Sequence, residues 1–124
     1  MSLETVADLV DNARVLLQDR VVPYRYETDQ LVAALNIALQ DARRIRPDIF
    51  LPDFKIPSYS PADLTAIIKF PDFYKSALLY FVVGFSYIRD QEDTSDARAG
   101  ALVSKFTAEL LGTAYPSSGA VNPQ

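Results

Sequence analysis

The chain has 124 residues, 49% of them apolar, which is typical of a single globular domain rather than a disordered segment. Cysteine and histidine are both absent, so disulfides, thiolate or imidazole metal ligands and histidine-dependent catalytic triads are excluded. Twelve basic residues against sixteen acidic ones give a formal charge of −4, which disfavours a dedicated nucleic-acid binder.

The first predicted helix begins near Thr5 and ends before Val21. Thr5 and Asp8 have the spacing of a weak capping box, in which each side chain bonds the other residue's backbone. Apolar residues recur at intervals of three and four, as on one face of an amphipathic helix, and Arg14 falls outside this stripe. The stripe comprises Val6, Leu9, Val10, Ala13, Leu16 and Leu17.

A second helix is predicted from Thr28, a good N-cap residue, to Pro47, which stops it. The connection over residues 21–27 is short, so the two helices are expected to form an antiparallel hairpin. The apolar stripe of this helix comprises Leu31, Ala34, Leu35, Ala38, Leu39, Ala42 and Ile45.

Residues 47–71 are predicted to form a long ordered loop. Five prolines interrupt the segment too often for a helix, yet it is rich in large apolar residues that disordered linkers lack. We expect a helical turn after Pro61 and a short extended piece over Ala66–Phe70. Long ordered loops in small domains are often functional.

A third helix is predicted over Asp72–Arg89, with Asp72 as its cap. It is apolar nearly all round, and a small bundle has little room to bury a whole helix, so we expect part of it to contact another subunit. Within it, the apolar run Ala77–Phe85 is too short to cross a bilayer, and no basic signal-peptide region opens the chain. Synthesis in the cytoplasm without membrane association is expected.

A fourth helix is predicted from Thr94 or Ser95 to Gly112, a favoured residue just past a helix end. The expected fold class is therefore all-α: a small four-helix bundle with a long ordered middle loop and an extended C-terminal tail. The predicted domain covers residues 1–112, including loop 47–71, and the tail covers residues 113–124.

Catalytic and metal-binding patterns are weak in this sequence. The acidic cluster over residues 90–96 would need glycine in place of Ser95 and glutamate in place of Ala101 to form an EF-hand loop, so a solvated helix–helix turn is favoured. No nucleophile elbow and no glycine-rich phosphate loop is present. We expect no enzyme activity, no cofactor and no metal site.

Contact residues are more plausible than catalytic ones. Three arginines in the last turn of the second helix could touch phosphates or match the helix dipole, and loop aromatics are typical of interfaces. The candidate contact residues for other subunits or partners are Tyr24, Tyr26, Arg43, Arg44, Arg46, Phe50, Phe54, Tyr59, Tyr115 and Pro116.

Four framework motifs lie within residues 5–111. They are VADLVDNARVLLQD over residues 6–19, Tyr24-Arg-Tyr26, Leu35-Asn36-x-Ala38-Leu39-x-x-Ala42-Arg43 ending at Arg46-Pro47, and Tyr80-x-x-x-x-Phe85-x-Tyr87-x-x-Asp90-x-Glu92 followed by Ala97, Ala101 and Phe106. The last is the most distinctive. With this pattern the chain resembles the head-to-tail adaptor (connector) proteins of tailed bacteriophages.

The resemblance implies a non-enzymatic structural protein of the virion neck. It implies a homo-oligomeric ring, commonly of twelve copies, that docks on the portal protein and presents a platform to the tail tube or nozzle protein. Genomic DNA would pass through the lumen without specific binding. The middle loop and the C-terminal tail are the segments that such proteins usually offer to neighbours.

Two other functions are compatible with the sequence. One is a small helical nucleic-acid-binding protein, for packaging or regulation, that uses Arg43, Arg44 and Arg46. The other is a metal-dependent enzyme built on the acidic residues 90–96. We rank the adaptor first and the metal enzyme last.

Overall fold

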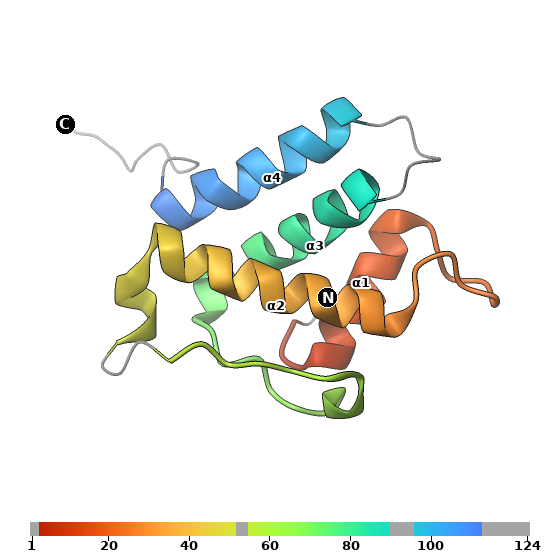
Figure 1. The fold of residues 1–124 in the computed structure, drawn as a ribbon, viewed down its shortest axis with the longest axis horizontal. Helices are drawn as coiled ribbons and strands as arrows, with labels where there is room; N and C mark the ends of the chain where they lie inside the picture. The colour runs from red at the N-terminus through yellow and green to blue at the C-terminus, as the bar shows by residue number, and fades with distance from the viewer. Residues whose placement is uncertain (1–2, 52–54, 90–95, 113–124) are drawn as a thin grey trace.

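The computed structural model describes residues 3–51, 55–89 and 96–112, which form a small all-α bundle (Figure 1). This confirms the predicted fold class; the predicted tail over residues 113–124 lies outside the described residues. The described ranges contain no β-strand, only a single bridge between Thr5 and Ile67. The α-helices are α1 (Val6–Leu17), α2 (Thr28–Ile45), α3 (Lys75–Arg89) and α4 (Asp96–Leu111), with short 3-10 helices η1 (Pro47–Phe50), η2 (Pro61–Asp63) and η3 (Asp72–Tyr74).

The predicted capping box at the start of α1 is confirmed. The Thr5 hydroxyl accepts a hydrogen bond from the Asp8 N–H, and the Asp8 carboxylate accepts one from the Thr5 N–H, both at 3.1 Å. At the other end, Gln18 takes a left-handed conformation with φ of 56°. The following N–H, of Asp19, donates to the Arg14 carbonyl at 2.9 Å, which closes the helix and turns the chain back over it.

The start of α2 differs from the prediction by one residue. Thr28 was expected to be the N-cap, but it is the first residue of the helix and Glu27 is the N-cap. The Glu27 N–H donates to Oε1 of Gln30 at 3.0 Å. The Thr28 hydroxyl instead accepts a hydrogen bond from Nη2 of Arg14 at 3.1 Å, so its side chain serves a contact with α1.

Residues 47–51 and 55–71 form the ordered loop that the sequence predicts, including the turn η2 after Pro61. The Asn36 side chain of α2 fixes the loop by bonding both backbone groups of Tyr59, at 2.8 and 2.9 Å. The extended piece runs beside the residues before α1, where the Ile68 N–H donates to the Glu4 carbonyl at 2.9 Å. Ile68 and Phe70 are buried in the core.

Helix α3 is the central helix of the bundle, and the contact with another subunit that was predicted for part of it stays a prediction. It packs against α1, α2 and α4, and these neighbours cover its sides. They bury four apolar residues within the chain, so that these need no other subunit to cover them: Leu78, Leu79, Val82 and Val83. The helix starts at Lys75 rather than Asp72, because residues 72–74 form η3.

Helices α3 and α4 approach closely at Gly84. An added Cβ there would lie 3.0 Å from the Ala99 carbonyl oxygen and 3.1 Å from atoms of Leu102 and Val103. Helix α4 ends at Gly112, with φ of +77°, as the sequence predicts. The predicted start at residues 94–95 lies outside the described residues. In the described part of the chain, the helices are too short or too polar to span a membrane.

Candidate interaction surface

The loop between α1 and α2, residues 18–27, extends beyond the helices at one end of the molecule, on the right of Figure 1. We call it the α1–α2 loop. Its tip exposes Val21 and Val22, at 80% and 73% of their full accessible areas, and Tyr24 is also exposed. Two cations, Arg20 and Arg25, flank these residues and are themselves exposed. An apolar group with a polar rim is typical of an interaction site.

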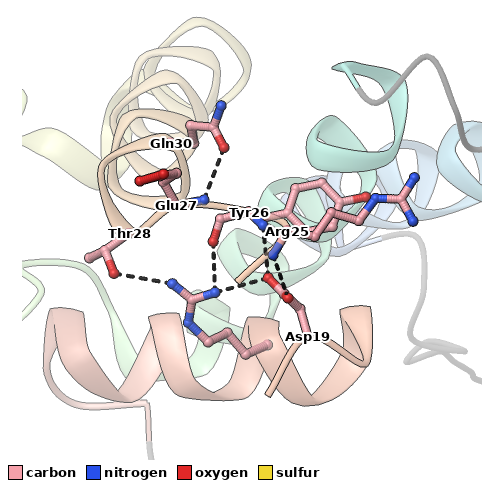
Figure 2. A network of polar contacts seen from close by, with 7 residues as sticks. Asp19, Arg25, Tyr26, Glu27, Thr28 and Gln30 are labelled. Carbon is pink, nitrogen blue, oxygen red and sulfur yellow. Dashed lines mark hydrogen bonds and ion pairs between the residues drawn. The ribbon is translucent and has the colours of Figure 1, made fainter. Parts of the chain in front are cut away.

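The α1–α2 loop is held by the buried guanidinium of Arg14 on α1. Nη1 donates to Oδ2 of Asp19 at 3.0 Å and to the Tyr26 carbonyl at 2.7 Å, while Nη2 donates to the Thr28 hydroxyl. Figure 2 shows how Asp19, Tyr26 and Thr28 converge from the beginning and the end of the loop. One side chain therefore ties both ends of the loop to α1.

Asp19 completes this network from the opposite side. Its two carboxylate oxygens accept hydrogen bonds from the backbone N–H groups of Arg25 and Tyr26, at 2.8 and 2.9 Å (Figure 2). The side chains of Asp19 and Arg14 are each only 7% exposed, so the pair is shielded from water. A buried ion pair is stable only when additional hydrogen bonds satisfy both charges, as they do here.

Tyr24 lies against the same guanidinium. Its ring centroid is 3.7 Å from Cζ of Arg14, a close cation–π contact. Asp19 before the exposed valines and Tyr24 after them both contact Arg14, so the tip is fixed on both sides. Because the loop is ordered before any partner arrives, binding through its tip requires little further loss of conformational entropy.

Two of the candidate aromatic residues lie inside the protein. Tyr26 is buried in the core beneath the α1–α2 loop, and Phe50 packs against Phe70 with ring centroids 5.9 Å apart. This corrects the expectation that both line a contact surface. Local sequence could not show that the loops fold back over the bundle.

Of the other candidate residues in loops, Tyr59 forms hydrogen bonds within the middle loop. The Tyr59 hydroxyl accepts a hydrogen bond from the Lys69 N–H at 2.8 Å and donates to the Ile67 carbonyl at 3.2 Å. Through these two bonds the Tyr59 hydroxyl joins backbone groups within the middle loop. Phe54, Tyr115 and Pro116 lie outside the described residues.

The three candidate arginines do not act as one group. Arg43 and Arg44 are exposed on the last turn of α2. Arg46 instead forms two hydrogen bonds to Asp48, at 2.8 and 2.9 Å, and a third to the Leu110 carbonyl. It therefore links the end of α2 to the end of α4, and it is less available to a phosphate than its two neighbours.

The Arg46–Asp48 pair makes a pH-dependent prediction. The hydrogen bond from Arg46 lowers the pKa of Asp48 below its ordinary value of 3.8. The pair thus stabilises the fold above that ordinary value, and its contribution is lost as the pH falls through the lowered pKa. An NMR titration of the folded chain should show Asp48 titrating below 3.8, and Arg46→Gln should return its pKa to the ordinary range. An unshifted Asp48 in the unsubstituted chain would contradict this assignment.

Arg14 and Asp19, like Val21 and Val22 at the tip, were not among the contact residues predicted from the sequence. Arg14 lies outside the apolar stripe predicted for α1, but it is buried in the structure. A signal was present, since Arg14 follows Val10 by four residues and precedes Leu17 by three, which is core spacing. A charged residue at such a position, next to a loop with an aspartate, indicates a buried pair.

Side chains that could hold a metal ion are not grouped in the described part of the chain: no three acidic residues come together there. The acidic cluster over residues 90–96 lies outside the residues whose side chains are described. Comparisons with protein-family models, with curated proteins and with solved structures give no match to this chain.

Proposed function

We propose that the chain is a head-to-tail adaptor of a tailed bacteriophage, a structural subunit of a ring between portal and tail. The observation that carries the proposal is the preordered apolar tip of the α1–α2 loop, presented at one end of a small all-α bundle. The sequence motifs add the resemblance to that family. The proposed role requires no catalytic group.

The physical demands of a ring support this assignment. In a closed ring each subunit contacts its two neighbours through two different faces. A subunit therefore needs a rigid core and at least one protruding element with apolar surface. The bundle supplies the first through α3, and the α1–α2 loop supplies the second.

The proposed partners follow from the same role. They are further copies of this chain, expected to be twelve, a portal protein on one side and a tail tube or nozzle protein on the other. The net charge of −4 suits a ring through which DNA passes without binding. The proposed location is the virion neck, after synthesis in the host cytoplasm.

The test is co-assembly with the portal of the same virus. We expect negative-stain micrographs of the mixture to show a ring on the portal, and sedimentation to show the two proteins together. A chain that binds neither the portal nor the tail protein would overturn the proposal. The double variant Val21→Ser, Val22→Ser should assemble on the portal at least about tenfold more weakly than the unsubstituted chain, because it removes apolar area at the tip. Leu111→Ser, at another exposed apolar position, is the matched control.

A second candidate function uses the exposed arginines of α2. Arg43 and Arg44 could contact a phosphate backbone in a nucleic-acid-binding protein, whereas Arg46 is held by Asp48. Such binding would weaken steeply with salt and would be lost in Arg43→Ala, Arg44→Ala. The adaptor proposal instead expects no measurable binding of duplex DNA at low salt.

A further inference from the structure

A shallow pocket opens where the residues before α1 meet the start of α3. It has a volume of about 290 Å³ and is lined by Leu3, Glu4, Asp72, Lys75 and Ser76. This volume is slightly below the range of about 300–1,000 Å³ that small-molecule sites occupy. The pocket is thus suited to a few side chains of a protein partner.

The pocket presents negative charge to its surroundings. Glu4 is exposed at its edge, and the Asp72 side chain is 91% exposed. The one cation, Lys75, is buried, and its Nζ lies 3.0 Å from Oδ1 of Asp72. The Ser76 hydroxyl donates to Oε1 of Glu109 at 3.0 Å, so it is also engaged. The exposed carboxylates would therefore repel an anionic ligand and attract a cationic one.

Apolar surface accompanies these charges. Leu3 lines the pocket itself. Ile67, which pairs with Thr5 next to Glu4, and Phe73, which follows Asp72, are both more than half exposed. The region therefore combines acidic groups with exposed apolar side chains, which is the complement of the α1–α2 loop with its two arginines and two valines.

We infer that the α1–α2 loop of one copy docks at this pocket on the next copy, an inference that rests on the proposed ring function. Arg20 and Arg25 would face the carboxylates of Glu4 and Asp72, and the valine tip would cover the apolar residues. Such complementarity fixes the register of two surfaces and suppresses wrong pairings.

The placement of the two surfaces supports a contact between copies. In Figure 1 the α1–α2 loop projects on the right, whereas the first turn of α3 lies to the left, on the other side of α1. The loop is anchored to its own α1 by Arg14, so it is held away from the pocket of its own chain. In the proposed ring this loop-to-pocket contact is heterologous, and it repeats from copy to copy.

A charge exchange between chains tests the docking. We expect Arg20→Glu alone and Glu4→Lys alone each to weaken self-association at least tenfold, measured by sedimentation velocity at low ionic strength. An equimolar mixture of the two variants should restore it, because each reversed surface then meets a complementary one. Arg43→Glu and Asp11→Lys make the same charge changes elsewhere on the exposed surface and should leave association unchanged. A mixture that associates no better than the separate variants overturns the inference.

Cysteine cross-linking gives a second readout that does not depend on stable rings. The chain has no cysteine, so V22C and L3C introduced into separate copies provide the only thiols. Oxidation of the mixture should give a covalent heterodimer on a non-reducing gel, and V22C mixed with D11C should not. Absence of the V22C–L3C product overturns the docking.

The two proposals fail in different ways. A ring on the portal without the specific cross-link and without rescue by charge exchange would leave the adaptor standing and remove the loop–pocket contact. A specific cross-link without any binding to portal or tail protein would support the loop–pocket contact and remove the adaptor proposal.

Discussion

Replacing Asp19 with alanine should lower the free energy of unfolding by about 3–5 kcal/mol, the largest effect that we expect from a single surface-loop residue. The change leaves the Arg14 guanidinium buried without its carboxylate and removes the acceptor for the N–H groups of Arg25 and Tyr26. Breaking one partner of a buried ion pair costs this much because the remaining charge stays desolvated. Chemical denaturation followed by circular dichroism measures it.

The control for this change is Asp41→Ala. Asp41 also pairs with an arginine, Arg44, but at 3.7 Å and on the exposed surface. Its removal should cost no more than about 0.5 kcal/mol. If Asp19→Ala proved no more harmful than Asp41→Ala, the network would not hold the loop in the way described.

The double variant Arg14→Met, Asp19→Ala separates charge from packing. Removing both charges leaves no unpaired buried ion at this site, so the double change should cost less than the sum of the two single changes. Amide exchange in residues 18–27 should still accelerate, because the loop loses the side chain that joins its ends.

Gly84→Ala is expected to destabilise the fold by about 1–3 kcal/mol, although alanine favours helices. The new Cβ would lie 3.0 Å from the Ala99 carbonyl oxygen, so α3 and α4 would have to move apart. Overpacking of a closely packed interior costs energy of this order. The effect should appear as a lower melting temperature with unchanged helix content.

Gly100→Ala is the matched control on the facing helix. A Cβ at Gly100 has no atom within 4 Å, so the substitution gains helix propensity without a clash. It should stabilise the chain by up to about 1 kcal/mol. The prediction is that the two glycine-to-alanine changes have opposite signs, and the same sign for both would contradict the close helix approach at Gly84.

Much of the helical structure could be predicted because it depends on local sequence. The capping box of Thr5 and Asp8, the turn after Pro61 and the end of α4 at Gly112 each require only residues a few positions apart. The start of α2 was missed for the opposite reason. Thr28 has the right side chain for an N-cap, but Arg14, fourteen residues earlier, takes its hydroxyl.

Burial was harder to predict than helicity. Helix α3 is apolar on all sides, which is equally typical of a subunit contact and of a central helix, and only the packing of α1, α2 and α4 decides between them. Tyr26 and Phe50 posed the same problem, since aromatic residues in loops can face outward or fold back into the core. The candidate surface was therefore predicted only in part: Tyr24 is exposed as expected, but the valines at the tip and the buried Arg14–Asp19 pair were not anticipated.

The anchoring of the α1–α2 loop separates two tasks along ten residues. Arg14, Asp19 and Thr28 hold the loop through their side chains, while Tyr26 contributes its backbone groups. Residues 20–22 take no part in that network. Substitutions at these residues should therefore leave the fold intact. The sequence of the tip can thus change whenever the surface that it contacts changes. The same separation makes the tip a position at which a short foreign peptide can be grafted and displayed.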